Sequence, residues 1–234
     1  MLPRVLHQTD HAVYASKPSG MFVHPTEEQR NSGETLLTWL RDRLGKYVYP
    51  VHRIDRASSG VVCMGLDSES AAALQSCLQE TTAIKSYLVL VRGETEVSFE
   101  CDLPLSRRKK EPPVPARSRF KQIMFKKGFS LLEATIETGR RHQIRRHLAR
   151  LGHQVVGDST YGKGRINEGL RQDFGLPRLF LHAYLLDHPA HSAQMPAHCQ
   201  IDPLPADLLV FLRLLFEQPD LFPNGMIHPE SRPD

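Results

Sequence analysis

The segment of this sequence that is best suited to catalysis contains an acidic residue between two arginines. In VHRIDRASSG, Asp55 lies between Arg53 and Arg56, directly after a short apolar run. Neighbouring guanidinium groups favour the ionised form of a carboxylate, and a partly buried carboxylate can act as a nucleophile or a base. An exposed ion pair or a turn-forming aspartate would give the same local pattern. The segment alone therefore leaves both interpretations open.

Two further segments carry residues that suit a nucleic-acid site. ETGRRHQIRRHLARLGHQVVGDSTYG combines arginines, turn glycines and the start of a helix, which can supply phosphate contacts and one buried partner for a carboxylate. An ordinary basic helix would have the same composition. KSYLVLVRG places Tyr87 among apolar residues of a strand, where a tyrosine is either part of the core or a ring on which a base stacks.

The histidines do not follow a metal-binding pattern. His142 and His147 are separated by five positions, and the sequence has neither an HExxH motif nor a paired CxxC motif, so we expect no metal site. His52 is better suited to a structural hydrogen bond than to a role as general base.

Two other enzyme classes are less consistent with these residues. A metal-dependent nuclease would use His52, Asp55 and some of Asp158, His182 and His188, but the sequence lacks an acidic cluster, and sensitivity to EDTA would reveal such an enzyme. A glycoside hydrolase needs two cooperating carboxylates. Asp55 is the one carboxylate whose neighbouring residues evidently suit a catalytic role.

The composition is typical of a globular chain that folds without help. The 234 residues are 40% hydrophobic and 24% charged, which is enough to bury a core without a disulfide, a metal or a protein partner. The four cysteines form no CxxC pair, and no apolar stretch is long enough for a bilayer. We therefore expect a cytoplasmic monomer with reduced cysteines, no membrane contact and one domain over residues 1–234.

Positive charge is concentrated in the middle of the chain rather than spread evenly. The formal net charge is only +4. The clusters comprise Arg107, Arg108, Lys109 and Lys110; Arg117, Arg119 and Lys121; Lys126 and Lys127; and Arg140, Arg141, Arg145, Arg146 and Arg150. A central basic band is the pattern expected for binding a phosphate backbone. A solvated surface, or an RNA-binding protein without catalytic activity, would show the same band.

The elements that must position these residues alternate without a regular βαβ rhythm. Strands are predicted on both sides of the turn KPSG and in VVCMGL, KSYLVLVRG, SLLEATIET and RLFLHAYLL. Helices are predicted in SGETLLTWLRDRLG, with Ser32 as N-cap and Gly45 as stop, in SESAAALQSCLQE, with Ser68 as N-cap, and in LPADLLVFLRLLF. In RRHQIRRHLARLG, Ile144, Leu148 and Leu151 are predicted to face inward. Prolines make the segment from Pro104 to Lys121 an exposed loop. This intermixture favours an α+β fold.

Together these segments resemble the RluA-type family of pseudouridine synthases along most of the chain. KPSGMFVHP is similar to the family turn KPxGxxVHP, VHRIDRASSG to HRLDxxTSG, and KSYLVLVRG to KxYxAxVxG. Further on, ETGRRHQIRRHLARLGHQVVGDSTYG resembles TGRxHQLRxHxxxxGHPIxGDxxYG, and RLFLHAYLL resembles RxxLHAxxL. Ile54, Ser58 and Gln154 depart from the usual leucine, threonine and proline. None of these departures removes a group that the reaction needs.

The resemblance implies a fold, a reaction and a set of residue roles. The fold is a mixed, mostly antiparallel β-sheet flanked by helices and loops around a central RNA-binding cleft, without an N-terminal S4-like domain. The reaction isomerises uridine to pseudouridine without a cofactor. Asp55 is then the catalytic carboxylate, which attacks ribose C1′ or uracil C6 or promotes formation of a glycal. Tyr87 lies against the flipped uracil and is a candidate for removal of the C5 proton. Arg145 pairs with Asp55, with Arg146 and Arg140 as the alternatives.

The resemblance also implies how RNA is held and which RNA it is. Arg53 fills the space vacated by the flipped base. The RNA-binding residues are Arg53, Arg56, Arg140, Arg141 and Arg146. The segments HQIRRHLARLGHQVVGDSTYG and DFGLPRLFLHA are most similar to those of tRNA-modifying members, which implies a tRNA uridine at the base of the T stem. An rRNA uridine or another tRNA uridine is the alternative substrate.

Overall fold

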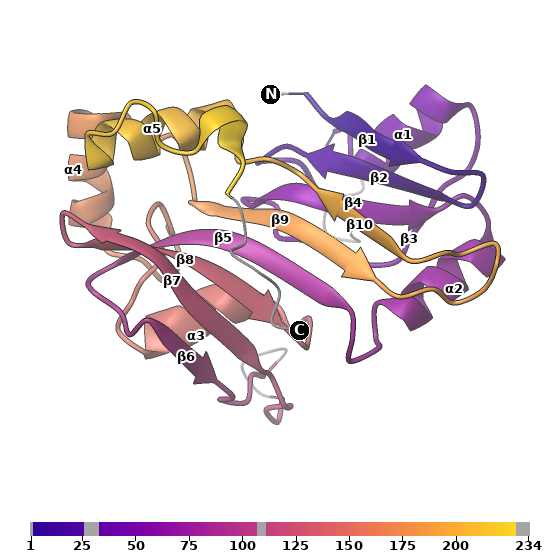
Figure 1. Cartoon of the computed structure of the whole chain (residues 1–234), viewed down its shortest axis with the longest axis horizontal. Helices are drawn as coiled ribbons and strands as arrows, with labels where there is room; N and C mark the ends of the chain where they lie inside the picture. Colours follow the sequence, from indigo (N-terminus) through magenta and orange to yellow (C-terminus); the bar gives the residue numbers. More distant parts are fainter. Residues whose placement is uncertain (1, 26–32, 107–110, 228–234) are drawn as a thin grey trace.

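A single twisted β-sheet runs through the molecule and carries helices on both faces (Figure 1). The computed structural model describes residues 2–25, 33–106 and 111–227. Ten strands of this part form the sheet, eight of them in the order β1-β2-β4-β9-β5-β8-β7-β6. In addition, β3 pairs with β4, and β10 pairs with β9. The strands are β1 (Arg4–Gln8), β2 (Ala12–Lys17), β3 (Tyr49–Pro50), β4 (Ser59–Gly65), β5 (Ile84–Arg92), β6 (Ser98–Cys101), β7 (Ser118–Lys126), β8 (Phe129–Ile136), β9 (Leu181–His188) and β10 (His198–Ile201).

Strand pairing confirms the predicted α+β class. The pairs in the sheet are antiparallel, except for β4 and β9, which run parallel at Ser59 and Gly60 opposite His182 and Ala183. Gly60 has a φ of 126°, and a Cβ atom at this position would lie 2.3 Å from the carbonyl oxygen of Ala183. Only glycine therefore allows the two halves of the sheet to join this closely.

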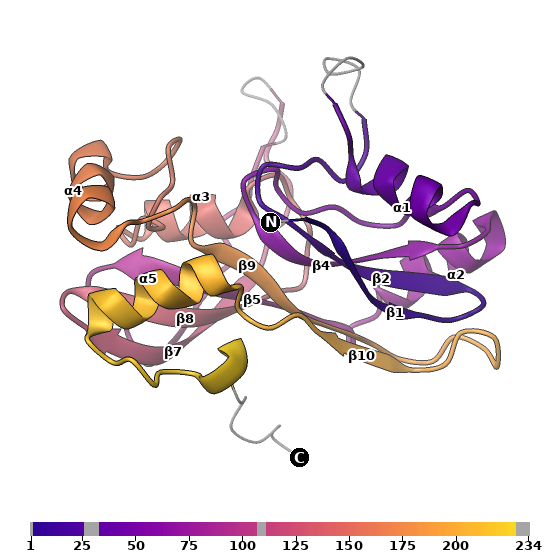
Figure 2. The same cartoon turned by 90° about the horizontal axis from the view of Figure 1, so that it is seen from above.

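Five α-helices flank the sheet in the described part of the chain. Seen from above, α1 and α3 lie along one side of the sheet and α5 lies along the other (Figure 2). The helices are α1 (Leu36–Leu44), α2 (Ser68–Cys77), α3 (Gln143–Arg150), α4 (Gly164–Phe174) and α5 (Ala206–Phe216). None of these helices is long and apolar enough to cross a bilayer.

The alternation of apolar residues in β5 builds two cores, one on each face of the sheet. Leu88 and Leu90 belong to the cluster that packs under α5, whereas Val89 and Val91 belong to the cluster that packs under α3. Successive side chains of a strand point to opposite faces, so a continuous apolar run buries both faces. The strand that carries Tyr87 is thus fixed from both sides.

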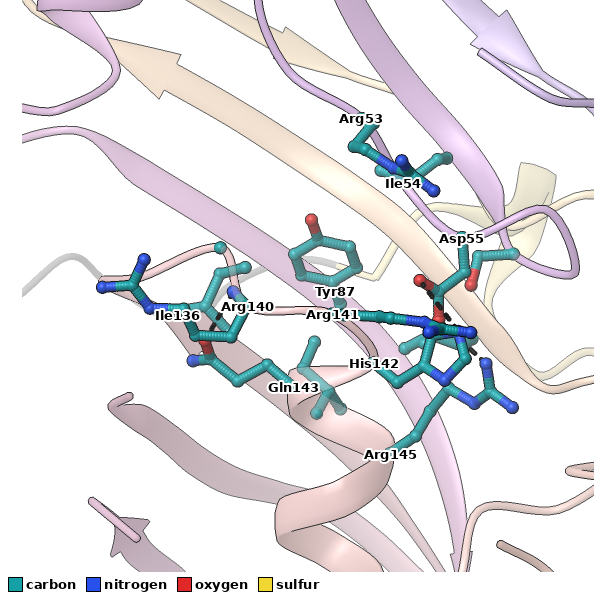
Figure 3. A pocket seen from close by; sticks show the side chains of 14 residues that line it. Arg53, Ile54, Asp55, Tyr87, Ile136, Arg140, Arg141, His142, Gln143 and Arg145 are labelled. Carbon is teal, nitrogen blue, oxygen red and sulfur yellow. Dashed lines mark hydrogen bonds and ion pairs between the residues drawn. The ribbon is translucent and has the colours of Figure 1, made fainter. Parts of the chain in front are cut away.

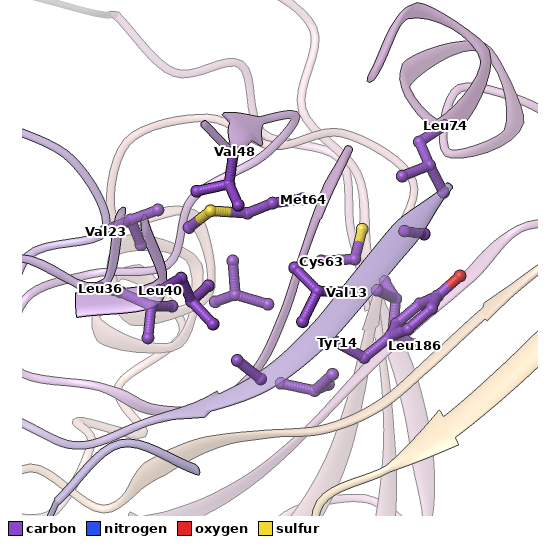
Figure 4. Close-up of a cluster of buried hydrophobic side chains, with 14 of the residues drawn as sticks. Val13, Tyr14, Val23, Leu36, Leu40, Val48, Cys63, Met64, Leu74 and Leu186 are labelled. Atoms are coloured by element: carbon purple, nitrogen blue, oxygen red, sulfur yellow. The ribbon is translucent and has the colours of Figure 1, made fainter. Parts of the chain in front are cut away.

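A third core fixes the strands that flank the Asp55 segment. Leu36 and Leu40 of α1 and Leu74 of α2 pack with Val13 and Met64 of the sheet, and all five side chains are fully buried (Figure 4). Burial of each such side chain stabilises the fold by about 1.5–3 kcal/mol. The segment between β3 and β4, which contains Asp55, is therefore flanked by strands that this core holds in place.

The helix ends differ from the sequence predictions in two N-caps. Thr35 caps α1 through a reciprocal pair with Thr38, and Ser32 lies outside the described residues. Asp67 caps α2 because its carboxylate accepts a 2.7 Å hydrogen bond from the Ser70 amide, so the prediction of Ser68 was wrong by one residue. The predicted stop at Gly45 is confirmed, with a φ of 65°.

Three other local predictions were wrong. Both strands of the first segment, β1 and β2, come before Pro18 of the KPSG turn, because the turn between them lies at Thr9 to His11. Leu151 follows α3 as its C-cap and is 40% exposed, so it does not face inward. The Pro104–Lys121 loop ends earlier than predicted, since Ser118 begins β7 and Leu105 pairs with Val114.

Candidate active site

A pocket of about 200 Å³ lies where the segment after β3 meets β5, β9 and the start of α3 (Figure 3). Arginines and apolar side chains both line it. Its lining consists of Arg53, Ile54, Asp55, Ser58, Tyr87, Ile136, Gly139, Arg140, Arg141, His142, Gln143, Ile144, Arg145 and Leu181. All three predicted catalytic residues and three of the five predicted RNA-binding arginines are therefore gathered in one place.

Asp55 is held in the pocket by Arg145. The Nη1 group of Arg145 donates a 3.0 Å hydrogen bond to Oδ2 of Asp55. The Arg145 side chain is 6% exposed and that of Asp55 is 21% exposed, so the pair is shielded while one carboxylate edge still reaches the pocket. A buried pair of this kind fixes orientation, because an isolated buried charge would be strongly unfavourable.

The remainder of the Arg145 guanidinium is bound by a second carboxylate, Asp158. Its Nε and Nη2 groups donate hydrogen bonds of 2.8 and 2.9 Å to the two oxygens of Asp158, whose side chain is fully buried. The amides of Thr160 and Tyr161 also donate to Asp158. Burial alone would raise the pKa of Asp158, but the hydrogen bonds from Arg145 and these amides lower it below the ordinary value. Asp158 therefore stays ionised and locks the arginine in place.

The turn that presents Asp55 is held in place by hydrogen bonds from Lys17. The amide of Ser58 donates to the carbonyl of Asp55, which closes the turn. The fully buried ammonium group of Lys17 donates to the carbonyl oxygens of Pro18, Met21, Arg56 and Ser58 at 2.7–3.3 Å. Burial lowers the pKa of Lys17 to about 7, Arg178 and Arg56 lower it further, and the charge of Asp55 acts in the opposite direction. Lys17 thus joins the KPSG turn to the Asp55 turn.

Replacement of Lys17 by methionine is expected to destabilise the protein by about 2–4 kcal/mol, because it leaves buried carbonyl groups without a donor. Urea unfolding measures this loss. The matched control is Lys46→Met, on the exposed segment after α1, which should change stability by less than about 0.5 kcal/mol. Equal stability of wild type and Lys17→Met would contradict the assigned role.

Tyr87 places its ring in the pocket wall, and Figure 3 shows the hydroxyl directed away from Asp55. Burial raises the pKa of the Tyr87 phenol, and the charge of Asp55 adds to the effect. The phenol is therefore neutral at physiological pH. It can support a ring and donate a hydrogen bond, but it is a poor base in this state.

His142 also lies close to Asp55. Its Nε2 lies 3.9 Å from Oδ1 of Asp55, and its Nδ1 lies 3.1 Å from the hydroxyl of Tyr161. The backbone of His142 is left-handed, with a φ of 53° and a ψ of 32°. Such a conformation costs a non-glycine residue about 1–3 kcal/mol and persists where the surroundings impose it.

The predicted RNA-binding arginines have different environments. Arg53 and Arg141 are exposed at the pocket. Arg56 donates to the carbonyl of Gly20 and lies 4.8 Å from the Phe22 ring centroid. Arg140 donates to the carbonyl of Pro115, and Arg146 to that of Ser106. Arg56, Arg140 and Arg146 thus also support local structure, and the cluster Arg107–Lys110 lies outside the described residues.

Sequence reasoning missed the residues that support the site. Lys17, Tyr161 and the left-handed backbone of His142 received no site role, and Asp158 was considered only as a metal ligand of a nuclease. For Asp158, the available signal was the sequence GDSTYG, in which glycine, aspartate and serine predict a turn whose amides can bind a carboxylate.

His52 is confirmed as a structural hydrogen bonder, since its Nε2 accepts from the Cys63 amide, and burial lowers its pKa to about 4. Within the described residues, no group of three His, Cys, Asp or Glu side chains is arranged to hold a metal ion.

Comparison with known proteins identifies the family of the chain. Residues 11–150 match the family model described as RNA pseudouridylate synthase. The chain is 32% identical to tRNA pseudouridine synthase C of Vibrio vulnificus, over 85% of this chain and 90% of the relative. It is 34% identical to tRNA pseudouridine synthase C of Yersinia pestis, over 79% of this chain and 81% of the relative.

Solved structures share the fold. The human RNA pseudouridylate synthase domain containing 4 has a TM-score of 0.74 at 21% identity and covers 90% of this chain and 92% of its own. The human RNA pseudouridylate synthase domain containing 1 has a TM-score of 0.71 at 24% identity and covers 89% and 87%. The ordered motifs, the sheet and the family match lead to one conclusion: the chain belongs to the RNA pseudouridylate synthase family and is an enzyme that isomerises uridine in RNA to pseudouridine.

Proposed function

We propose that the chain modifies a uridine of tRNA at the base of the T stem, with Asp55 as the catalytic carboxylate. One observation carries the catalytic part of the proposal. Asp55 has one oxygen fixed by Arg145, which Asp158 fixes in turn, while the carboxylate borders a pocket walled by Tyr87. The choice of tRNA rests on the relatives named tRNA pseudouridine synthase C.

The site suits the chemistry of the isomerisation. The bond between N1 of uracil and the ribose breaks, the base turns, and C5 forms the new bond, so no electrons enter or leave. A single oriented carboxylate can start this reaction at C1′, at C6 or through a glycal. A target within a duplex must first be extruded, at a cost of a few kcal/mol. The exposed Arg53 at the pocket rim suits the role of filling the vacated position in the stack.

Tyr87 is assigned the contact with the extruded base. Its ring lines the pocket that Asp55 borders, and its neutral phenol can donate a hydrogen bond to a uracil carbonyl. Removal of the C5 proton by Tyr87 requires that its raised pKa fall when substrate is bound. The carboxylate of Asp55 and the imidazole of His142 are the other bases that line the pocket.

Arg141 is assigned to the phosphate backbone, since it is exposed at the pocket rim. Arg141→Ala should weaken RNA binding several-fold, lower the salt dependence of log Kd by about one unit and leave kcat within about two-fold. Binding titrations at several salt concentrations measure these effects. The control is Arg171→Ala on α4, an exposed arginine 3.4 Å from Glu168 and outside the pocket lining, which should leave Kd unchanged. An unchanged salt slope in Arg141→Ala would remove Arg141 from the RNA interface.

The proposed function is tested with the purified chain and separate tRNA and rRNA transcripts. Modified positions are mapped by carbodiimide adducts and primer extension. A single stop at the base of the T stem supports the proposal. A stop at another tRNA uridine, or in rRNA alone, would overturn the assigned substrate and leave the reaction in place.

A further inference from the structure

His142 presents one ring nitrogen to the carboxylate that starts the reaction. Its Nε2 is 3.9 Å from Oδ1 of Asp55, the oxygen that Arg145 leaves free, and both residues line the pocket (Figure 3). This distance is too long for a direct hydrogen bond. The distance is nevertheless short enough for a single substrate oxygen to lie within hydrogen-bond reach of both Nε2 of His142 and Oδ1 of Asp55.

The imidazole is held by Tyr161, which also contacts the two residues that fix Asp55, Arg145 and Asp158. The Tyr161 hydroxyl lies 3.1 Å from Nδ1, and the two rings meet edge to face with centroids 5.8 Å apart. The Tyr161 ring also lies 5.2 Å below the guanidinium of Arg145, and the Tyr161 amide donates to Asp158. His142 and Asp55 are thus positioned relative to each other through one shared scaffold.

The backbone of His142 has a conformation that is uncommon for residues other than glycine. His142 occupies the N-cap of α3 in a left-handed conformation and forms no side-chain cap. Glycine is the usual residue in such a conformation, and asparagine, aspartate and histidine are enriched among the others. The histidine side chain is 21% exposed and faces the pocket, where its ring is available to a ligand.

The charge state of the ring suits a hydroxyl group. Burial lowers the pKa of His142, Arg145 and Arg141 lower it further, and Asp55 and Asp158 act in the opposite direction. A neutral imidazole carries one donor and one acceptor nitrogen, so it can pair with a hydroxyl in either sense. The neighbouring arginines can only donate.

We propose that His142 contacts the substrate and that its Nε2 forms a hydrogen bond with the 2′-hydroxyl of the target nucleotide. This inference rests on the proposed role of Asp55. The 2′-hydroxyl is attached to the carbon next to C1′, so a group beside the reacting carboxylate is well placed to meet it. The contact also distinguishes RNA from DNA at the target position, since the 2′-hydroxyl is what differs.

The test combines a variant with a modified substrate. His142→Asn keeps a residue that tolerates the left-handed backbone and an amide near the position of Nδ1, but it lacks any group at Nε2. The values of kcat/KM are measured for wild type and His142→Asn, each with an RNA carrying uridine or 2′-deoxyuridine at the target. The same RNA with a 2′-deoxy residue one nucleotide away is the control, and thermal unfolding of the variant checks the fold.

We expect each single change to lower kcat/KM by about ten-fold or more, and the combined change to lower it no further than the larger single effect. The control substrate should show no such coupling. If the two effects multiply, or if His142→Asn matches wild type, the inference is wrong. Where the deoxy substrate is not turned over, Kd is measured instead for the same four combinations of enzyme and RNA. Absence of product from wild type with the unmodified RNA would instead contradict the proposed function.

Discussion

Asp55→Asn is expected to abolish pseudouridine formation, with a loss of more than about a thousand-fold in kcat, while RNA affinity stays within about a few-fold. The amide keeps the shape of the side chain but is neither a nucleophile nor a base. RNA affinity is expected to depend mainly on phosphate contacts, which we assign to the surrounding arginines. Single-turnover assays and binding titrations on the same RNA measure both quantities.

The matched control for this variant is Asp42→Asn. Asp42 is an exposed carboxylate of α1, with a side chain that is 72% exposed. It should retain wild-type turnover, because it lies outside the pocket lining. Retained turnover in Asp55→Asn would show that another group performs the reaction.

Asp158→Asn should have the second largest effect, on stability and on activity together. The amide of asparagine would direct donor hydrogens at the guanidinium of Arg145, which can only donate. Loss of one partner from a buried ion pair costs about 3–5 kcal/mol, and the pair is 6% and 0% exposed. The loosened arginine would also release Asp55. We therefore expect a loss of about a hundred-fold in kcat, since small errors in placement have effects of this size.

Urea unfolding and single-turnover kinetics check this prediction, with Asp173→Asn on the exposed face of α4 as control. The pH dependence gives a second readout. Because folding lowers the pKa of Asp158, its contribution is fully present above the unfolded value of about 3.9 and is lost as the pH falls through the folded value. The stability difference between wild type and variant should thus be constant from pH 7 to about pH 5 and shrink below about pH 4. A difference that grows as the pH falls would contradict the role given to Asp158.

The sequence predicted the fold class and the reaction because their signals are local and ordered. Alternating or continuous apolar runs identify β5 and β8, and Gly45 marks the end of α1. The family motifs place Asp55, Tyr87 and Arg145, and the structure brings all three to one pocket. Their individual roles in catalysis stay predictions, as do the monomeric state and the boundaries of the domain.

The supporting residues could not be predicted because their partners are distant in sequence. Arg145 meets Asp55 across 90 positions, and Lys17 meets Ser58 across 41. Nothing in a charge pattern states that a lysine will be fully buried among carbonyl groups. The helix α4 was missed for another reason, since Gly162 and Gly164 at its start are typical of a turn.

The most direct test of the central claim is a map of pseudouridine in tRNA and rRNA from cells with and without the gene, complemented by wild type or by Asp55→Asn. We predict that a single tRNA site at the base of the T stem disappears without the gene and that wild type alone restores it. A map that stays the same in all four strains, or restoration by Asp55→Asn, would contradict the claim that Asp55 of this chain isomerises that uridine.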